Sequence, residues 1–210
     1  MMNFATRGLL GVTFIFSTAV TASASVIFDD SARQDFTSGR AAGNSPLAAI
    51  TVSAPVGIDQ IGAMVDLNAA ANIKFLIFDL NSATLLFSTT SAAYTDDGLT
   101  FKLSPVFSTF TLNPGTTYGI GAIADQGGLW GTNNSSSGNP FTQNNITASD
   151  DRNGNVSNFA SPGLIGEGSA MIIIELGQNA TAVPEPATYT LFGVGFATLG
   201  IVIKRRRQQI

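Results

Sequence analysis

The chain has 210 residues, of which 44% are hydrophobic and 11% charged, and it contains neither cysteine nor histidine. Without these two residue types there is no thiolate nucleophile, disulfide, cysteine- or histidine-ligated metal or histidine general base, so catalysis would depend on carboxylates, lysine, tyrosine or oxygen-ligated cations. Residues 25–182 carry five basic and thirteen acidic side chains, a net charge of about −8, which excludes the basic stripe that nucleic-acid binding requires.

The first 24 residues are typical of a secretory signal peptide. Residues 1–7 carry one positive side chain, residues 8–20 are largely apolar, and Ala22 and Ala24 form the small-residue pattern of a cleavage site. Cleavage is expected after Ala24, which makes Ser25 the first residue of the mature chain. The alternative is an uncleaved membrane anchor, but thirteen helical residues reach only about 20 Å of a hydrocarbon core about 30 Å thick.

Residues 25–182 are predicted to form one all-β domain, a two-sheet, jelly-roll-like sandwich. Short runs rich in β-forming residues alternate with turn residues at regular intervals, which is typical of such folds. The predicted strands are residues 47–53, 61–67, 73–80, 84–88, 100–103, 108–112, 118–124 and 170–176.

Two of the predicted connections are tight. Residues 73–80 and 84–88 are expected to form a hairpin with the three-residue turn Asn81-Ser82-Ala83. Residues 110–120, FTLNPGTTYGI, predict a strand, a proline–glycine turn and a second strand. This second stretch resembles a turn that is common in bacterial extracellular jelly-roll domains, including carbohydrate-binding-like modules, and the resemblance concerns the fold and no ligand.

Residues 125–162 are rich in glycine, asparagine and serine and are expected to form a long loop, functional or mobile. The loop holds Trp130, the only tryptophan. An aromatic face beside asparagine side chains could stack on a sugar, which would make Trp130 a carbohydrate contact. The favoured alternative is that Trp130 closes the open end of the sandwich.

The same loop offers a candidate calcium site. Asp151, Asn153 and Asn155 alternate as oxygen ligands do at the start of a metal loop. An EF-hand is excluded, because Val156 stands where the turn glycine belongs and Pro162 where the bidentate glutamate belongs. A weak calcium site is retained as the alternative to a solvated turn rich in Asp and Asn, and no other cofactor is expected.

Carboxylates are the remaining candidates for catalysis. Glu167 and Glu175 flank and occupy the last apolar run, and Asp96 and Asp97 lie in a turn before Gly98. A glycosidase-type acid and base need two carboxylates at a defined separation, which a sequence does not give. The prediction is that the protein has no catalytic residues and is no enzyme, with a secreted hydrolase as the least favoured alternative.

The last 28 residues have three parts. Pro184 and Pro186 hold Glu185 in an extended stretch. Residues 187–203 are uncharged and would be about 25 Å long as a helix, enough to span a slightly thinned bilayer. The basic cluster that follows, Lys204, Arg205, Arg206 and Arg207, would hold this end in the cytoplasm.

This tripartite end, residues 183–210, resembles the sorting signal of PEP-CTERM proteins in the order and spacing of its parts. The resemblance implies export by a Gram-negative bacterium and recognition of Pro184, Glu185 and Pro186 by a membrane transpeptidase, the exosortase. It also implies a product in the cell envelope or outside the cell, associated with extracellular polysaccharide and biofilm. The expected role is structural or adhesive, with an exopolysaccharide-binding module as the alternative, and the expected partners are the export machinery, the exosortase and, before processing, the membrane.

Overall fold

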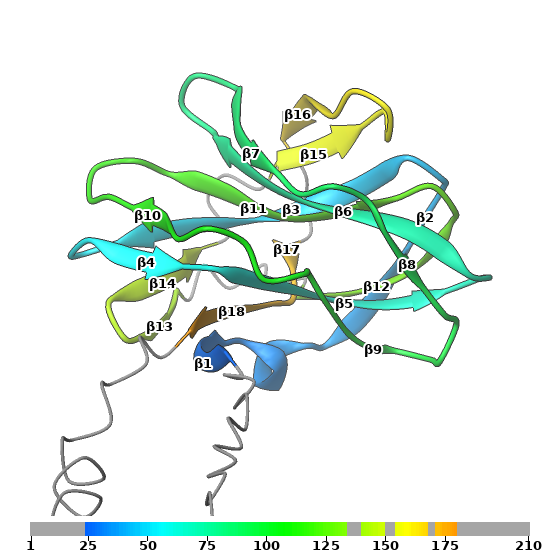
Figure 1. Ribbon diagram of the computed structural model, residues 1–210, viewed down its shortest axis with the longest axis horizontal. Helices are drawn as coiled ribbons and strands as arrows, with labels where there is room; N and C mark the ends of the chain where they lie inside the picture. Colours follow the sequence, from blue (N-terminus) through cyan, green and yellow to red (C-terminus); the bar gives the residue numbers. More distant parts are fainter. Residues whose placement is uncertain (1–23, 134–139, 150–153, 168–170, 180–210) are drawn as a thin grey trace, which may run out of the picture.

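The computed structural model describes residues 24–133, 140–149, 154–167 and 171–179, and they form a sandwich of two β-sheets (Figure 1). A short 3-10 turn, η1 (Ser31–Arg33), joins the first two strands. One sheet has seven strands: β1 (Ala24–Asp29), β2 (Phe36–Arg40), β5 (Gln60–Leu67), β9 (Thr100–Leu103), β12 (Gly128–Asn133), β17 (Met171–Ile172) and β18 (Ile174–Asn179).

The second sheet has nine strands, and a two-stranded ribbon lies beside the two large sheets. The nine strands are β3 (Asn44–Val52), β6 (Ala71–Asp79), β7 (Thr84–Ser88), β8 (Ala92–Tyr94), β11 (Tyr118–Ala124), β13 (Phe141–Gln143), β14 (Ile146–Ser149), β15 (Gly154–Ser157) and β16 (Gly163–Glu167). The ribbon pairs β4 (Val56–Ile58) with β10 (Phe110–Leu112). The predicted all-β sandwich is therefore confirmed.

The main core lies between the two sheets. In β5 every second side chain is buried there, from Ile61 to Leu67, because successive side chains of a strand point to opposite faces. β11 is buried along its whole length. Its second face packs into a smaller cluster with β15, which contains Leu47, Leu76, Phe78, Ile123 and Val156. Around β11 the nine-stranded sheet is thus buried on both faces.

The predicted strands differ from the observed ones mainly in number. β7, β9 and β11 have the predicted bounds, and the predicted strand 170–176 is divided into β17 and β18 at Ile173. The predicted long loop is wrong where the structure describes it, because residues 125–162 contain β12, β13, β14 and β15. The glycine-rich composition of this stretch led to the prediction of a loop in place of β12. Glycine is required in this strand, because a Cβ on Gly128 would lie 2.7 Å from the carbonyl oxygen of Asp66.

The two predicted connections have different outcomes. β6 and β7 do form a hairpin, but its loop has four residues, 80–83, because Asp79 pairs with Thr84. The carboxylate of Asp79 accepts hydrogen bonds from the N–H of Asn81 (2.8 Å) and the hydroxyl of Ser82 (2.9 Å), and these bonds lower the pKa of Asp79.

The predicted strand, proline–glycine turn and second strand are confirmed as β10, the turn and β11, but the two strands belong to different sheets and do not pair with each other. β10 pairs with β4, whereas β11 pairs with β3 and β6. The N–H of Asn113 donates a hydrogen bond to the hydroxyl of Tyr118 (2.8 Å), which holds the turn much as a tyrosine corner does. The turn therefore carries the chain between sheets.

Candidate functional site: the exit of the two chain ends

The first and last described strands are neighbours. β1 and β18 pair antiparallel from Ala24 opposite Asn179 to Asp29 opposite Glu175, with a bulge between Val26 and Phe28. The hydroxyl of Ser25 donates to the carbonyl of Gln178 (3.1 Å). The chain consequently enters and leaves the sandwich at one place, at the lower left of Figure 1.

Apolar side chains hold this strand pair in the sandwich. Phe28, Ile174 and Leu176 are fully buried in the main core. The ring of Phe28 meets that of Phe141 on β13 edge to face, with 5.5 Å between centroids. β18 is also flanked by β5, where Glu175 pairs with Gly62, so the last strand is an interior strand of its sheet.

The exposed side chains at this exit are polar and uncharged, and the acidic Asp59, whose N–H donates to the carbonyl of Gly177 (3.0 Å), is buried beside them. The turn between β13 and β14 reaches β1, where the side-chain amide of Asn144 donates to the carbonyl of Ile27 (2.8 Å). The hydroxyl of Ser53, after β3, donates to the side-chain oxygen of Asn145 (3.2 Å). The exit end is defined here as Ser25, Ser53, Asn144, Asn145 and Gln178, all of them exposed.

Most residues of the predicted sorting machinery lie outside the described residues. Ala22 does, and so do the motif of Pro184, Glu185 and Pro186 and the basic cluster. Ala24 and Ser25 begin β1, and the motif begins five residues after the last described residue, Asn179. In the part of the chain that the structure describes, no helix is long and apolar enough to cross a membrane.

Comparison with protein families identifies the end of the chain. Residues 182–207 match the family described as the PEP-CTERM protein-sorting motif. The class of protein is therefore that of exported proteins sorted through their C-terminus, here with a β-sandwich ahead of the motif. Comparisons with curated proteins and with solved structures give no match for this chain.

The buried position of Trp130 does not support the carbohydrate contact and agrees better with the favoured structural role. Its side chain is 1% exposed and belongs to the main core. The neighbouring Leu129 points to the other face of β12 and is 43% exposed. Because a sugar stacks on an accessible aromatic face, a buried indole provides no such surface.

The candidate calcium ligands are only partly described. Asp151 and Asn153 lie outside the described residues, and Asn155 is on β15, opposite Pro46 of β3. The side-chain oxygen of Asn155 is buried without a hydrogen-bond partner among the described residues. The described residues contain no cluster of three or more carboxylates that could hold a metal ion.

The candidate catalytic carboxylates are divided between the two sheets. Glu167 ends β16 in the nine-stranded sheet, whereas Glu175 lies on β18 in the seven-stranded sheet. Burial, and next the charge of Asp29 on β1, raise the pKa of Glu175. Asp97 forms an ion pair with Lys102. The fold therefore gives Glu167 and Glu175 no common strand or sheet on which to act as a pair.

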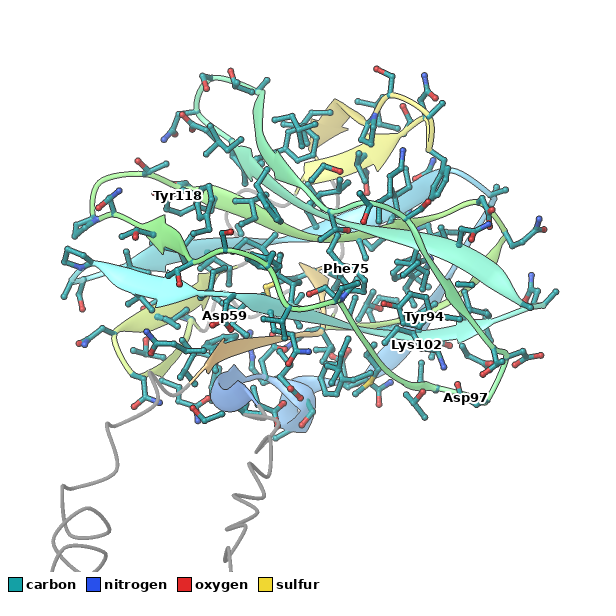
Figure 2. The ribbon with its side chains drawn as sticks, viewed as in Figure 1. Asp59, Phe75, Tyr94, Asp97, Lys102 and Tyr118 are labelled. Carbon is teal, nitrogen blue, oxygen red and sulfur yellow. The ribbon has the colours of Figure 1, made fainter. Side chains whose placement is uncertain are left out.

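Lys102 is a feature that the sequence did not indicate. It lies on the edge strand β9 opposite the core residue Ala63, and its side chain is 4% exposed. Its ammonium group bonds Asp97 and the hydroxyl of Thr100 (2.9 Å), and burial lowers its pKa. Figure 2 shows Lys102 near Tyr94 and Asp97, away from Tyr118 at the other end. An inward-pointing charge of this kind protects an edge strand from pairing with another chain.

Proposed function

We propose that the protein is a structural or adhesive component of the cell envelope or extracellular matrix. It reaches its place through its C-terminal motif and is processed by an exosortase-like transpeptidase. In this proposal it is no enzyme and needs no cofactor. The observation that supports the proposal is the sorting motif directly after a sandwich whose two chain ends leave together.

The paired ends suit processing of a folded protein. Residues 180–183 connect Asn179 to Pro184, and four extended residues span at most about 14 Å. Signal-peptide removal after Ala24 and cleavage near Pro184 would therefore occur close together, beside the exit end. Neither cut would require β18 to leave its place between β1 and β5.

The basic cluster provides the direct test of sorting. Replacing Lys204, Arg205, Arg206 and Arg207 by alanine is expected to leave full-length or misoriented precursor, because positive charges retain the cytoplasmic end of a membrane segment. The readout is intact mass with C-terminal peptide mapping of the protein from its native host. The matched control replaces Gln208 and Gln209 by alanine and should be processed normally. Normal processing of the alanine cluster variant would refute the proposal.

A further inference from the structure

We propose that the exit end faces a lipid headgroup surface while the precursor is anchored. The inference rests on the proposed function, since it requires the C-terminal segment to hold the chain at a membrane. It adds an orientation for the domain and a surface that meets the bilayer. The partner is an anionic lipid bilayer, and the surface consists of Ser25, Ser53, Asn144, Asn145 and Gln178.

Chain length brings the exit end close to the bilayer. Seven residues, 180–186, separate Asn179 from the apolar segment 187–203, and fully extended they span at most about 25 Å. The linker must first cross the headgroup layer on its side of the bilayer, which is about 5–7 Å thick. At physiological ionic strength the Debye length is about 8 Å, so a charge at the exit end lies within two or three screening lengths of the lipid surface.

The distribution of charge favours this orientation over the reverse. On the exit strands the first described acidic residues are Asp29 and Glu175, four residues or more from the ends, or about 13 Å along a strand. Asp66, Asp96, Asp97 and Asp125 lie at the other end of the sandwich, where β5 ends, β9 begins and β11 ends. Two acidic residues also lie at the same end of the sandwich as the exit: Asp59, which is buried at 3% exposure, and Asp79, which pairs with Tyr118. The four carboxylates at the far end outnumber them, so the acidic domain is presented to an anionic surface by its less acidic end.

The chemistry of the exit end also fits lipid headgroups. The side-chain amides of Asn144, Asn145 and Gln178 have N–H groups that can donate hydrogen bonds to phosphate oxygens, whereas the hydroxyls of Ser25 and Ser53 already donate within the protein. Asn144 and Asn145 have positive φ angles of 50° and 66°, which asparagine tolerates better than most residues, so the turn that carries them has a defined shape. Asparagine at these two positions thus serves both the turn and the surface.

The test measures the distance between the domain and the lipid in reconstituted full-length protein. Trp130 is the only tryptophan, so it serves as an energy-transfer donor to dansyl-labelled headgroups in vesicles of phosphatidylcholine with or without phosphatidylglycerol. The exit variant carries Asn145→Asp and Gln178→Glu. The matched control carries Asn68→Asp and Gln126→Glu, two exposed residues at the other end of the sandwich.

The exit variant is expected to lose about half of its energy transfer on phosphatidylglycerol vesicles, because its new charges are repelled over about one Debye length. It should transfer normally on pure phosphatidylcholine and at high salt, and the control should behave as the wild type. Equal transfer in the exit and control variants would overturn the proposal. So would slower processing of the exit variant with unchanged transfer, which would assign the surface to the processing enzyme.

Membrane insertion is measured separately, by vesicle flotation and resistance to alkaline extraction. A full-length chain that does not float with the vesicles refutes both the anchor of the proposed function and the orientation inferred from it. A chain that floats but shows no difference between the exit and control variants refutes the orientation alone. The two failures are therefore distinguishable.

Discussion

Replacing Trp130 by alanine is expected to lower the free energy of unfolding by about 3–5 kcal/mol. Trp130 is among the largest fully buried side chains and packs between the sheets, opposite Val65 of β5. Removal of the indole would leave a cavity, and the rigid strands around it could close that cavity only in part. Because domains are stable by only about 5–15 kcal/mol, the variant would have little stability left. Urea unfolding followed by far-UV circular dichroism measures the loss.

Two variants control for this result. Trp130→Phe keeps an aromatic ring in the core and should lose roughly half as much as Trp130→Ala. Leu129→Ala removes an exposed side chain from the same strand and should cost less than about 1 kcal/mol. A Trp130→Ala protein as stable as Leu129→Ala would mean that the indole is not packed in the core.

The second large effect concerns Asp30, whose carboxyl group is fully buried. One carboxyl oxygen accepts a hydrogen bond from the N–H of Ile174 (2.8 Å), and the other has no hydrogen-bond partner among the described residues. Burial raises the pKa of Asp30 from 3.8 to about 7, against the opposing effects of the Ile174 N–H and the charge of Arg33. The folded protein therefore retains this proton at pH values where the unfolded chain has lost it.

Stability is accordingly expected to fall as the pH rises from about 4 to about 7. In this window the folded state binds the proton of Asp30 and the unfolded state does not, so the free energy of unfolding falls by up to about 1.4 kcal/mol per pH unit. The contribution is fully present below pH 3.8 and is lost above about pH 7. Glu175, whose pKa is also raised by burial, adds a change of the same sign.

Asp30→Asn isolates this effect. Asparagine keeps an oxygen for the N–H of Ile174 but cannot ionise, so the variant should show a shallower pH dependence and exceed the wild type in stability at pH 8. Urea unfolding at a series of pH values measures both quantities. Glu175→Gln is the companion variant and should retain most of the slope. An unchanged slope in Asp30→Asn would show that this carboxyl group does not titrate as inferred.

Local sequence was sufficient where a feature depends on neighbouring residues alone. Runs of β-forming residues between turn residues were enough to predict the bounds of β7, β9 and β11. The sorting motif was equally visible, because a processing enzyme reads a short linear segment and the segment needs no tertiary partner to be recognised. By contrast β12, with its glycine and asparagine residues, is a strand because β2 and β5 pair with its two edges.

The role of Trp130 illustrates the same limit. Its neighbours in sequence, rich in glycine, asparagine and serine, suggested an exposed loop. Register decides otherwise, since Trp130 is paired with Val65 and therefore shares its inward face. A shift of one residue would have exposed the indole and buried Leu129. Sequence composition does not determine register when the partner strand lies some 65 positions away.

The sequence by itself thus determined the sorting class, the all-β fold and the exclusion of cysteine and histidine chemistry. Each of these depends on residue types or on patterns within a few neighbours. Only the tertiary structure decided that Ala24 lies opposite Asn179, that Lys102 points inward and that four carboxylates gather at the end of the sandwich away from the exit. The physical reason is that strand pairing forms hydrogen bonds between residues far apart in the chain, and their partners are chosen by the packing of the whole sandwich.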